Sequence, residues 1–219
     1  MRPRVRSLLP LLLCAAACSS GPPLRTYVLT PPIDQTAPTT ATLPLAGGPM
    51  APKERLEVRR SLVPDYLDST DILMRSGTDE VKASATGRWG ERLSLGLTRA
   101  LGADLAARMP QYSVVEDGSA TAQRQLRITI TALDLWQNGR CVLAANWSIV
   151  HQDSAMPVTS GSGTFDSQNA GGATTVTDAS LVEAVARALG KLADRIVPDA
   201  QANAERADAR RGSKVLSAE

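Results

Sequence analysis

The feature that most constrains the fold is an Asn138-Gly139 pair between two long segments of alternating apolar and polar residues. Asn-Gly is the strongest short hairpin signal, because both central positions of a type I′ turn need a positive φ. Residues 124–136 and 141–151 flank the pair, and period-two alternation predicts strands that bury one face. The inward set of the first strand is Leu126, Ile128, Ile130 and Ala132. We therefore expect a long antiparallel hairpin, extended to a meander by a third strand at residues 158–165.

Two other segments repeat apolar residues at helical spacing, which places each set on one side of a helix. The first stripe consists of Trp89, Leu93, Leu97, Leu101 and Leu105. The second consists of Leu181, Val185, Leu189, Leu192 and Ile196. Thr177 or Asp178 can cap the start of the second helix. Because proline removes a helical hydrogen bond, Pro110 is expected to end the first helix and Pro198 the second.

Shorter strands are expected at residues 55–59, 72–75, 80–83 and 112–115. The resulting order, strands, helix, four strands, helix, predicts an α+β fold. It would be a two-layer domain with a mainly antiparallel sheet and two helices on one face. We place this domain at residues 53–198. Residues 199–219 are Ala-rich with balanced charge and no apolar stripe, so we expect a frayed helix or a disordered tail there.

The N-terminus has the order of a bacterial export signal. Three arginines lie among the first six residues, a short apolar run interrupted by Pro10 follows, and Ala15-Ala16-Ala17 supplies small residues for cleavage. Ten apolar residues are too few to span a bilayer as a helix, which takes about 20. We therefore expect residues 1–17 to be removed on export.

Cys18 directly follows the small residues, and Ala-Ala-Ala-Cys resembles a bacterial lipobox, in which the cysteine is acylated and becomes the new N-terminus. The alternative is an ordinary soluble cleavage at the same bond. Ser19 after the cysteine favours the outer membrane by the sorting rule of enteric bacteria. Several acyl chains would hold the protein on a membrane, since each buried CH₂ contributes about 0.8 kcal/mol. Removing residues 1–17 leaves 21 basic against 22 acidic residues, so no basic surplus points to nucleic acid.

Residues 18–52 are expected to form a lipidated tether and a linker rich in Pro, Thr, Ala and Gly. Within them, residues 25–29 are a short β-like run that Pro31-Pro32 stops. This run either adds a strand to the main sheet or belongs to the tether, and the sequence leaves both readings open.

No set of residues in the chain has the spacing of an enzyme or metal site. His151 is the single histidine and has no nucleophile or metal-ligand pattern around it, so we expect an ordinary strand-end residue. Cys141 is the one cysteine left beside Cys18, and we expect a buried small side chain. Gly161-Ser162-Gly163 and Gly171-Gly172 lack the spacing of a phosphate loop, and four aspartates at residues 65–79 lack that of a calcium loop. We expect no cofactor, no metal and no catalytic residues.

Several motifs carry a family resemblance when they are taken in chain order. They are the lipobox at Cys18, Tyr27-Val28-Leu29, Leu62-Val63-Pro64-Asp65-Tyr66-Leu67-Asp68, Ile72-Leu73-Met74-Arg75, Arg88-Trp89-Gly90-Glu91-Arg92-Leu93, and residues 181–189. This series resembles the ABC-type transport auxiliary lipoproteins of the paraquat-inducible protein C type. The resemblance runs from Cys18 to about residue 198, and it does not explain the linker at 30–52 or the tail.

The resemblance implies a non-enzymatic outer-membrane lipoprotein on the periplasmic face. It would serve mammalian-cell-entry (MCE) domain proteins or ABC transporter components that move lipids between membranes, and a homo-oligomer would suit such a docking role. Candidate partner or assembly residues are Pro64, Tyr66, Leu67, Arg75 and Trp89. The alternative for residues 64–67 is a packed corner in which Tyr66 buries its ring. The alternative function is a periplasmic lipid-binding module that holds an acyl chain between the sheet and the helices.

Overall fold

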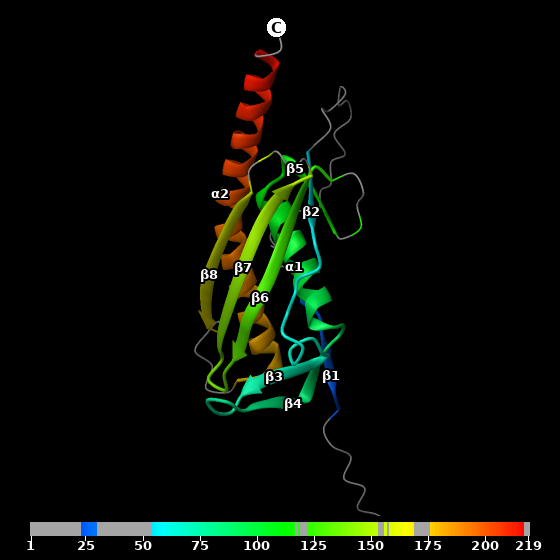
Figure 1. Cartoon of the computed structure of the whole chain (residues 1–219). Helices are drawn as coiled ribbons and strands as arrows, with labels where there is room; N and C mark the ends of the chain where they lie inside the picture. The colour runs from blue at the N-terminus through cyan, green and yellow to red at the C-terminus, as the bar shows by residue number, and fades with distance from the viewer. Residues whose placement is uncertain are drawn as a thin grey trace, which may run out of the picture.

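The structure is a computed structural model that describes residues 23–29, 54–116, 118, 122–152, 156, 158–168 and 176–216. The expected export signal, the acylation site at Cys18, most of the linker and Gly171-Gly172 lie outside these residues. The described chain contains eight strands and two helices (Figure 1). In order they are β1 (Arg25–Tyr27), β2 (Glu54–Val58), β3 (Asp71–Arg75), β4 (Val81–Trp89), α1 (Leu93–Arg108), β5 (Tyr112–Glu116), β6 (Arg124–Leu135), β7 (Arg140–His151), β8 (Thr159–Gln168) and α2 (Asp178–Leu216).

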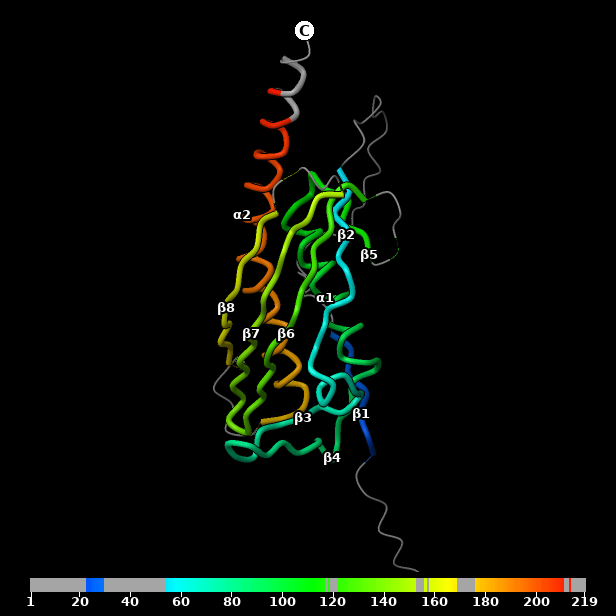
Figure 2. The backbone as a smooth tube through the Cα atoms, in the orientation of Figure 1, coloured from blue at the N-terminus to red at the C-terminus, as the bar shows by residue number. Residues whose placement is uncertain are grey.

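The main sheet has the strand order β5-β2-β6-β7-β8. Strands β6, β7 and β8 form the expected antiparallel meander, and Gly139 in the first hairpin has a φ of 81°. Strand β2, by contrast, runs parallel to both β5 and β6. Helices α1 and α2 cover one face of this sheet and pack against each other (Figures 1 and 2). The predicted α+β, two-layer architecture is confirmed, although both sheets of the fold are mixed rather than mainly antiparallel.

A second, three-stranded sheet of order β1-β4-β3 crosses one end of the molecule, which we call the basal end (Figure 1). The short run at residues 25–29 therefore adds a strand to this sheet, parallel to β4, and not to the main sheet. Trp89 ends β4 and pairs with Tyr27, so its expected place on the first helical stripe is wrong. Gly90 follows directly, and α1 begins only at Leu93.

The core lies between the main sheet and the two helices. The remaining residues of both predicted helical stripes are buried. In β6 the pairing register shifts between Ile130 and Ala132, and such a bulge moves the inward positions by one residue. As a result Leu133 and Leu135 are buried, in place of the predicted Ala132.

The second helix does not end where the sequence predicts. Pro198 lies inside α2, which continues to Leu216, and the last turns rise beyond the main sheet at the end opposite the basal end (Figure 2). Ala200 and Ala207 of this continuation are buried. The prediction that Pro198 stops the helix is therefore wrong.

Candidate functional site

Residues 64–68, which carry the most recognisable sequence motif, form a tight corner just before β3. The Leu67 N–H donates to the Pro64 carbonyl at 2.9 Å, and the Asp68 N–H donates to the Asp65 carbonyl at 3.2 Å. Leu67 is 4% exposed, whereas Tyr66 is 49% exposed. The corner is real, but the expectation that Tyr66 buries its ring is wrong. Leu67 fills the corner, and Tyr66 stands at the surface.

Asp68 of the same motif caps the start of α1. This helix has no side-chain cap of its own at Arg92. Asp68 Oδ1 accepts a hydrogen bond from the Ser94 N–H at 3.1 Å, and Arg60 and Arg92 lie 3.4 and 3.5 Å from Oδ2. Partial burial raises the pKa of Asp68, but the hydrogen bonds from Ser94 and the charges of Arg60 and Arg92 outweigh it, so the pKa is lowered. Asp68 is therefore an ionised residue with a structural role at the start of α1.

The other two candidate contact residues also join parts of the fold. Arg75 Nε, at the end of β3, donates to Asp134 Oδ1 of β6 at 2.7 Å and so ties the basal sheet to the main sheet. Trp89 is 5% exposed and belongs to the core cluster. Among the five predicted contact residues, Tyr66 alone is exposed; Pro64 and Arg75 are half-buried. Whether any of them contacts a partner stays a prediction.

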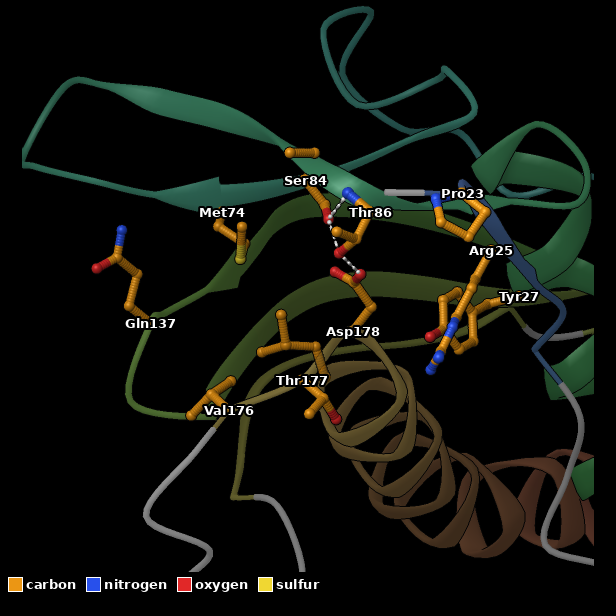
Figure 3. A pocket seen from close by; sticks show the side chains of 12 residues that line it. Pro23, Arg25, Tyr27, Met74, Ser84, Thr86, Gln137, Val176, Thr177 and Asp178 are labelled. Atoms are coloured by element: carbon orange, nitrogen blue, oxygen red, sulfur yellow. Dashed lines mark hydrogen bonds between the residues drawn. The ribbon is translucent and has the colours of Figure 1, made fainter. Parts of the chain in front are cut away.

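A groove of about 670 Å³, which we call the basal groove, opens beside these elements. It is formed by β1, the end of β3, the middle of β4, the β6–β7 turn and the start of α2 (Figure 3). Its lining residues are Pro23, Arg25, Tyr27, Met74, Ser84, Ala85, Thr86, Gln137, Val176, Thr177, Asp178 and Leu181. Both apolar and polar side chains line it, and the size is that of a small-molecule or acyl-chain site.

A line of hydrogen bonds joins β4 to the start of α2 inside the basal groove (Figure 3). Thr86 Oγ1 donates to Asp178 Oδ2 at 2.6 Å. Ser84 Oγ accepts from the backbone N–H groups of Thr86 and Gly87, both at 3.1 Å. A side chain at Gly87 would not fit, because a Cβ there would lie 2.6 Å from Asp178 Cγ. This contact fixes the first turn of α2 on the basal sheet.

The polar groups of the basal groove take part in hydrogen bonds that hold the fold together. Its described lining holds no histidine, cysteine or lysine. The Ser84 oxygen is already used by two backbone N–H groups, and the carboxylate of the lining, Asp178, accepts from Thr86 rather than from Ser84. Thr177 caps α2 by accepting from the Ser180 N–H at 3.2 Å. Of this site the sequence predicted only the helix start at Thr177 or Asp178.

Comparison with known proteins identifies the family of this fold. A family model described as "ABC-type transport auxiliary lipoprotein component" matches residues 27–197. The chain belongs to this family. The matched range begins in β1 and ends one residue before Pro198, so it includes the motif corner and every lining residue of the basal groove except Pro23 and Arg25. As a member of the ABC-type transport auxiliary lipoproteins, the chain is a lipoprotein component that assists transport.

Individual relatives agree with this assignment. The chain is 24% identical over 137 residues to the intermembrane transport lipoprotein PqiC of Escherichia coli K12, covering 63% of this chain and 69% of PqiC; PqiC of Shigella flexneri gives the same values. A crystal structure of an uncharacterized protein aligns with a TM-score of 0.63 and 16% identity over 81% of this chain and 98% of that one. The crystal structure of protein XCC0632 from Xanthomonas campestris aligns with a TM-score of 0.56 and 15% identity. This alignment covers 72% of this chain and 93% of that one. The structural matches support the fold of this auxiliary lipoprotein.

Four residues that were considered as site residues from the sequence lie in strands of this auxiliary lipoprotein: Cys141, His151, Gly161 and Gly163. Cys141 is buried, as predicted, and burial raises the pKa of its thiol to about 12. His151 ends β7 and is 9% exposed, so it is a strand-end residue but not a surface one. Gly161 and Gly163 lie within β8. Among the described residues, no group of His, Cys, Asp or Glu is arranged to hold a metal ion. No helix within the described ranges is long and apolar enough to cross a membrane.

Proposed function

We propose that this chain is an outer-membrane lipoprotein, anchored through acyl chains on Cys18 at the periplasmic face. It acts as a non-enzymatic docking subunit of an intermembrane lipid transport system, which contains an MCE-domain protein or ABC transporter components, and so supports envelope integrity. The observation that carries this proposal is the family match over residues 27–197, preceded by a lipobox nine residues upstream. PqiC, which the chain resembles, is named an intermembrane transport lipoprotein.

The fold suggests how such an anchor orients the domain. Six residues separate Cys18 from β1, and a fully extended chain of that length spans at most roughly 25 Å. Anchoring at Cys18 would therefore hold the basal end close to the lipid surface (Figure 1). Helix α2 starts at the basal end and has 39 residues, so it reaches roughly 58 Å away from it. The opposite end would then face a transport component that arrives from the periplasm.

Recovery of partners from membranes tests the docking role. Cells that express the full lipoprotein are treated with a reversible crosslinker, and the protein is purified with its neighbours for mass spectrometry. We expect an MCE-domain or transporter component to be enriched over a control lipoprotein with the same lipobox. Purification that yields neither would overturn the docking role. The size of the uncrosslinked complex in detergent tests the separate prediction of a homo-oligomer.

Lipid labelling and fractionation test the anchor. The protein should incorporate labelled palmitate and sediment with outer membranes, and Cys18→Ala should abolish the label. Label that persists in Cys18→Ala would overturn the attachment site. Because acidic residues after the cysteine retain lipoproteins in the inner membrane of enteric bacteria, Ser19→Asp should move the protein there. Unchanged fractionation of Ser19→Asp would contradict this sorting signal.

A lipid-binding role is the second candidate, and the basal groove is the observation that favours it. Tyr27, Met74 and Leu181 give it an apolar side, and it would open next to the membrane in the orientation above. Native mass spectrometry of the domain without residues 1–18 should then show a bound lipid. Ala85→Trp, which fills the groove from its exposed wall, should remove that lipid. A lipid-free wild-type domain would eliminate this candidate and leave the docking role untouched.

A further inference from the structure

Within the described residues, the outer edge of β8 is open along half of its length. Strand β8 ends the main sheet, and its partner strand there is β7. The Gln168 carbonyl accepts from Arg187 Nε at 2.9 Å, and the Asp166 carbonyl accepts from Lys191 Nζ at 2.5 Å. Even-numbered residues of β8 thus turn their backbone groups away from β7. By the same alternation Ser160, Ser162 and Thr164 present outward N–H and C=O groups. None of the described residues forms a hydrogen bond with them.

This open segment lacks the features that normally protect an edge strand. Residues 160–164 read Ser-Gly-Ser-Gly-Thr, without lysine, proline or any charge. Glycine and serine have a low propensity for strands, but packing against aromatic rings compensates for it here. Gly161 lies against the Trp147 ring, and Gly163 lies against the Phe165 ring. A Cβ at Gly161 would lie 2.5 Å from Trp147 Cζ2, so glycine lets the strand lie flat on the aromatic ring. A flat, uncharged edge with unpaired backbone groups is a template for another strand.

The length of the open edge decides what can occupy it. Five residues of strand span roughly 17 Å. At the basal side the edge is closed by Arg187 and Lys191, which reach the carbonyls of β8 from α2 (Figure 2 shows α2 alongside β8). The whole edge of β8 from a second copy could not pair along its ten residues without displacing both side chains. A short extended segment of another protein fits between Ser160 and Thr164 without moving them.

The charge beside the edge decides the chemistry of that segment. Alternate side chains of an added strand would point toward α2, where Arg187, Lys191 and Arg195 repeat every four residues. Glu183 lies 3.7 Å from Arg187, and Asp199 lies 3.2 Å from Arg195. Lys191 forms no ion pair within 4 Å in the described part of the chain. Its Nζ donates to the Asp166 carbonyl, and its charge also helps to lower the pKa of the Asp166 carboxyl. An acidic side chain on the added strand would pair with it.

We propose that the outer edge of β8 from Ser160 to Thr164 is a docking site. It takes an extended, acidic segment of a partner protein as a sixth strand of the main sheet. Backbone hydrogen bonds to Ser160, Ser162 and Thr164 hold the segment, and Lys191 selects its charge. The inference deepens the docking role proposed above and rests on it, because the partner is the transport component that this lipoprotein serves.

Photo-crosslinking from the edge tests the site in the intact lipoprotein in its membrane. A benzophenone amino acid replaces Ser162, whose side chain points to the exposed face, or replaces exposed Thr129 of β6 as the matched control. We expect position 162, and not 129, to give an adduct with the transport component that general crosslinking recovers. The crosslinked peptide should come from an extended acidic segment. An adduct with a second copy of the chain, or none while general crosslinking succeeds, would overturn the proposal.

Proline and alanine variants separate backbone pairing from side-chain contact. Ser162→Pro removes one outward N–H and leaves the β7–β8 hydrogen bonds in place, whereas Ser162→Ala keeps that N–H. We expect Ser162→Pro to lower partner recovery by about tenfold or more, as for a lost buried hydrogen bond, and Ser162→Ala to retain it. Lys191→Gln should lower recovery several-fold and Lys191→Arg should not. Equal recovery with Ser162→Pro would overturn the edge site alone.

Two controls keep the interpretations apart. Circular dichroism and thermal unfolding show whether Ser162→Pro is folded; if it is not, the photo-crosslinking result decides by itself. Wild-type membranes that yield no transport component in either experiment remove the proposed function and this site together. Wild-type membranes that yield the component, with crosslinks only at other surfaces, remove the β8 edge and leave the proposed function standing.

Discussion

The indole nitrogen of Trp147, in β7, donates a hydrogen bond to Asp199 Oδ2 of α2 at 3.0 Å, one residue beyond the proline inside that helix. Arg195 lies over the same indole, 5.8 Å from the ring centroid, and pairs with Asp199. Four residues further on, Asn203 Nδ2 donates to Thr159 Oγ1 of β8 at 3.0 Å. Pro198 has no N–H to donate to the carbonyl of Asp194, four residues earlier in the helix. Both residues are exposed, so water can bond this carbonyl instead. These contacts hold α2 on the sheet past a residue that usually ends a helix.

Truncation tests how far α2 belongs to the domain. A chain that stops after Pro198 loses the Trp147–Asp199 and Thr159–Asn203 hydrogen bonds and the buried Ala200 and Ala207. We expect its free energy of unfolding to fall by roughly 2–4 kcal/mol. A chain that stops after Arg210 keeps all these contacts and should unfold at the wild-type denaturant concentration. Urea titration followed by circular dichroism measures both. Equal stability of the two truncations would show that the contacts contribute nothing.

A double-mutant cycle isolates the Trp147–Asp199 contact. Trp147→Phe and Asp199→Ala each remove one partner of the hydrogen bond, so the two losses should not add. We expect a coupling energy of about 1 kcal/mol in the free energy of unfolding. Because Phe is smaller than Trp, the single Trp147→Phe variant should lose more stability than Asp199→Ala. Strictly additive losses would mean that the hydrogen bond has no net effect on stability.

The β6–β7 hairpin and the apolar stripes of the helices could be predicted, because the spacing of apolar residues and the residue types of a turn are properties of neighbouring residues in the sequence. Asn138-Gly139 and the alternation on both sides suffice for β6 and β7. The bulge after Ile130 could not be predicted by extending that period, and the only sign of it was that Leu133 and Leu135 are both apolar. Trp89 was misplaced because its four-residue spacing from Leu93 is accidental. Gly90 between them marks the end of a strand.

The candidate site was harder to predict, because it is assembled from distant segments. The basal groove combines β1, β4 and the start of α2, and no spacing in the sequence indicates that Thr86 meets Asp178. Likewise, Asp68 looked like part of a surface motif until α1 was seen to begin beside it. The open edge of β8 depends on the strand order, because β8 is an edge strand only as long as no other strand pairs beyond it. Local rules cannot supply such long-range pairings.

Substitution of Gly87 tests the packing of α2 against the basal sheet. A Cβ there would lie 2.6 Å from both Cγ and Oδ2 of Asp178, so Gly87→Ala must displace either the Asp178 side chain or the first turn of α2. We expect a loss of about 1–3 kcal/mol in the free energy of unfolding. Gly102 in α1 is the matched control, since a Cβ there meets nothing within 4 Å. Gly102→Ala should stabilise the protein by about 0.5–1 kcal/mol. If both variants destabilise equally, the Gly87 contact is not specific.

The Asp68 cap predicts a pH dependence of stability. The pKa of Asp68 in the folded protein is below the ordinary value of 3.8, because the hydrogen bonds from Ser94 and the charges of Arg60 and Arg92 outweigh partial burial. The unfolded chain therefore takes up a proton first as the pH falls. The contribution of Asp68 is fully present above the unfolded pKa and is lost as the pH falls through the lower folded pKa.

Asp68→Asn isolates this contribution, because it keeps an acceptor for the Ser94 N–H and removes the charge. At pH 7 the variant should be less stable than wild type by about 0.3–1 kcal/mol, the usual effect of a negative charge near a helix N-terminus. The difference should shrink as the pH falls below about 4, since wild type then loses what the variant never had. Urea titrations between pH 7 and pH 3 measure it, with Asp65→Asn, on the exposed side of the same corner, as the control that should follow wild type. A wild-type advantage over Asp68→Asn that stays constant down to pH 3 would show that the advantage does not come from the charge of Asp68.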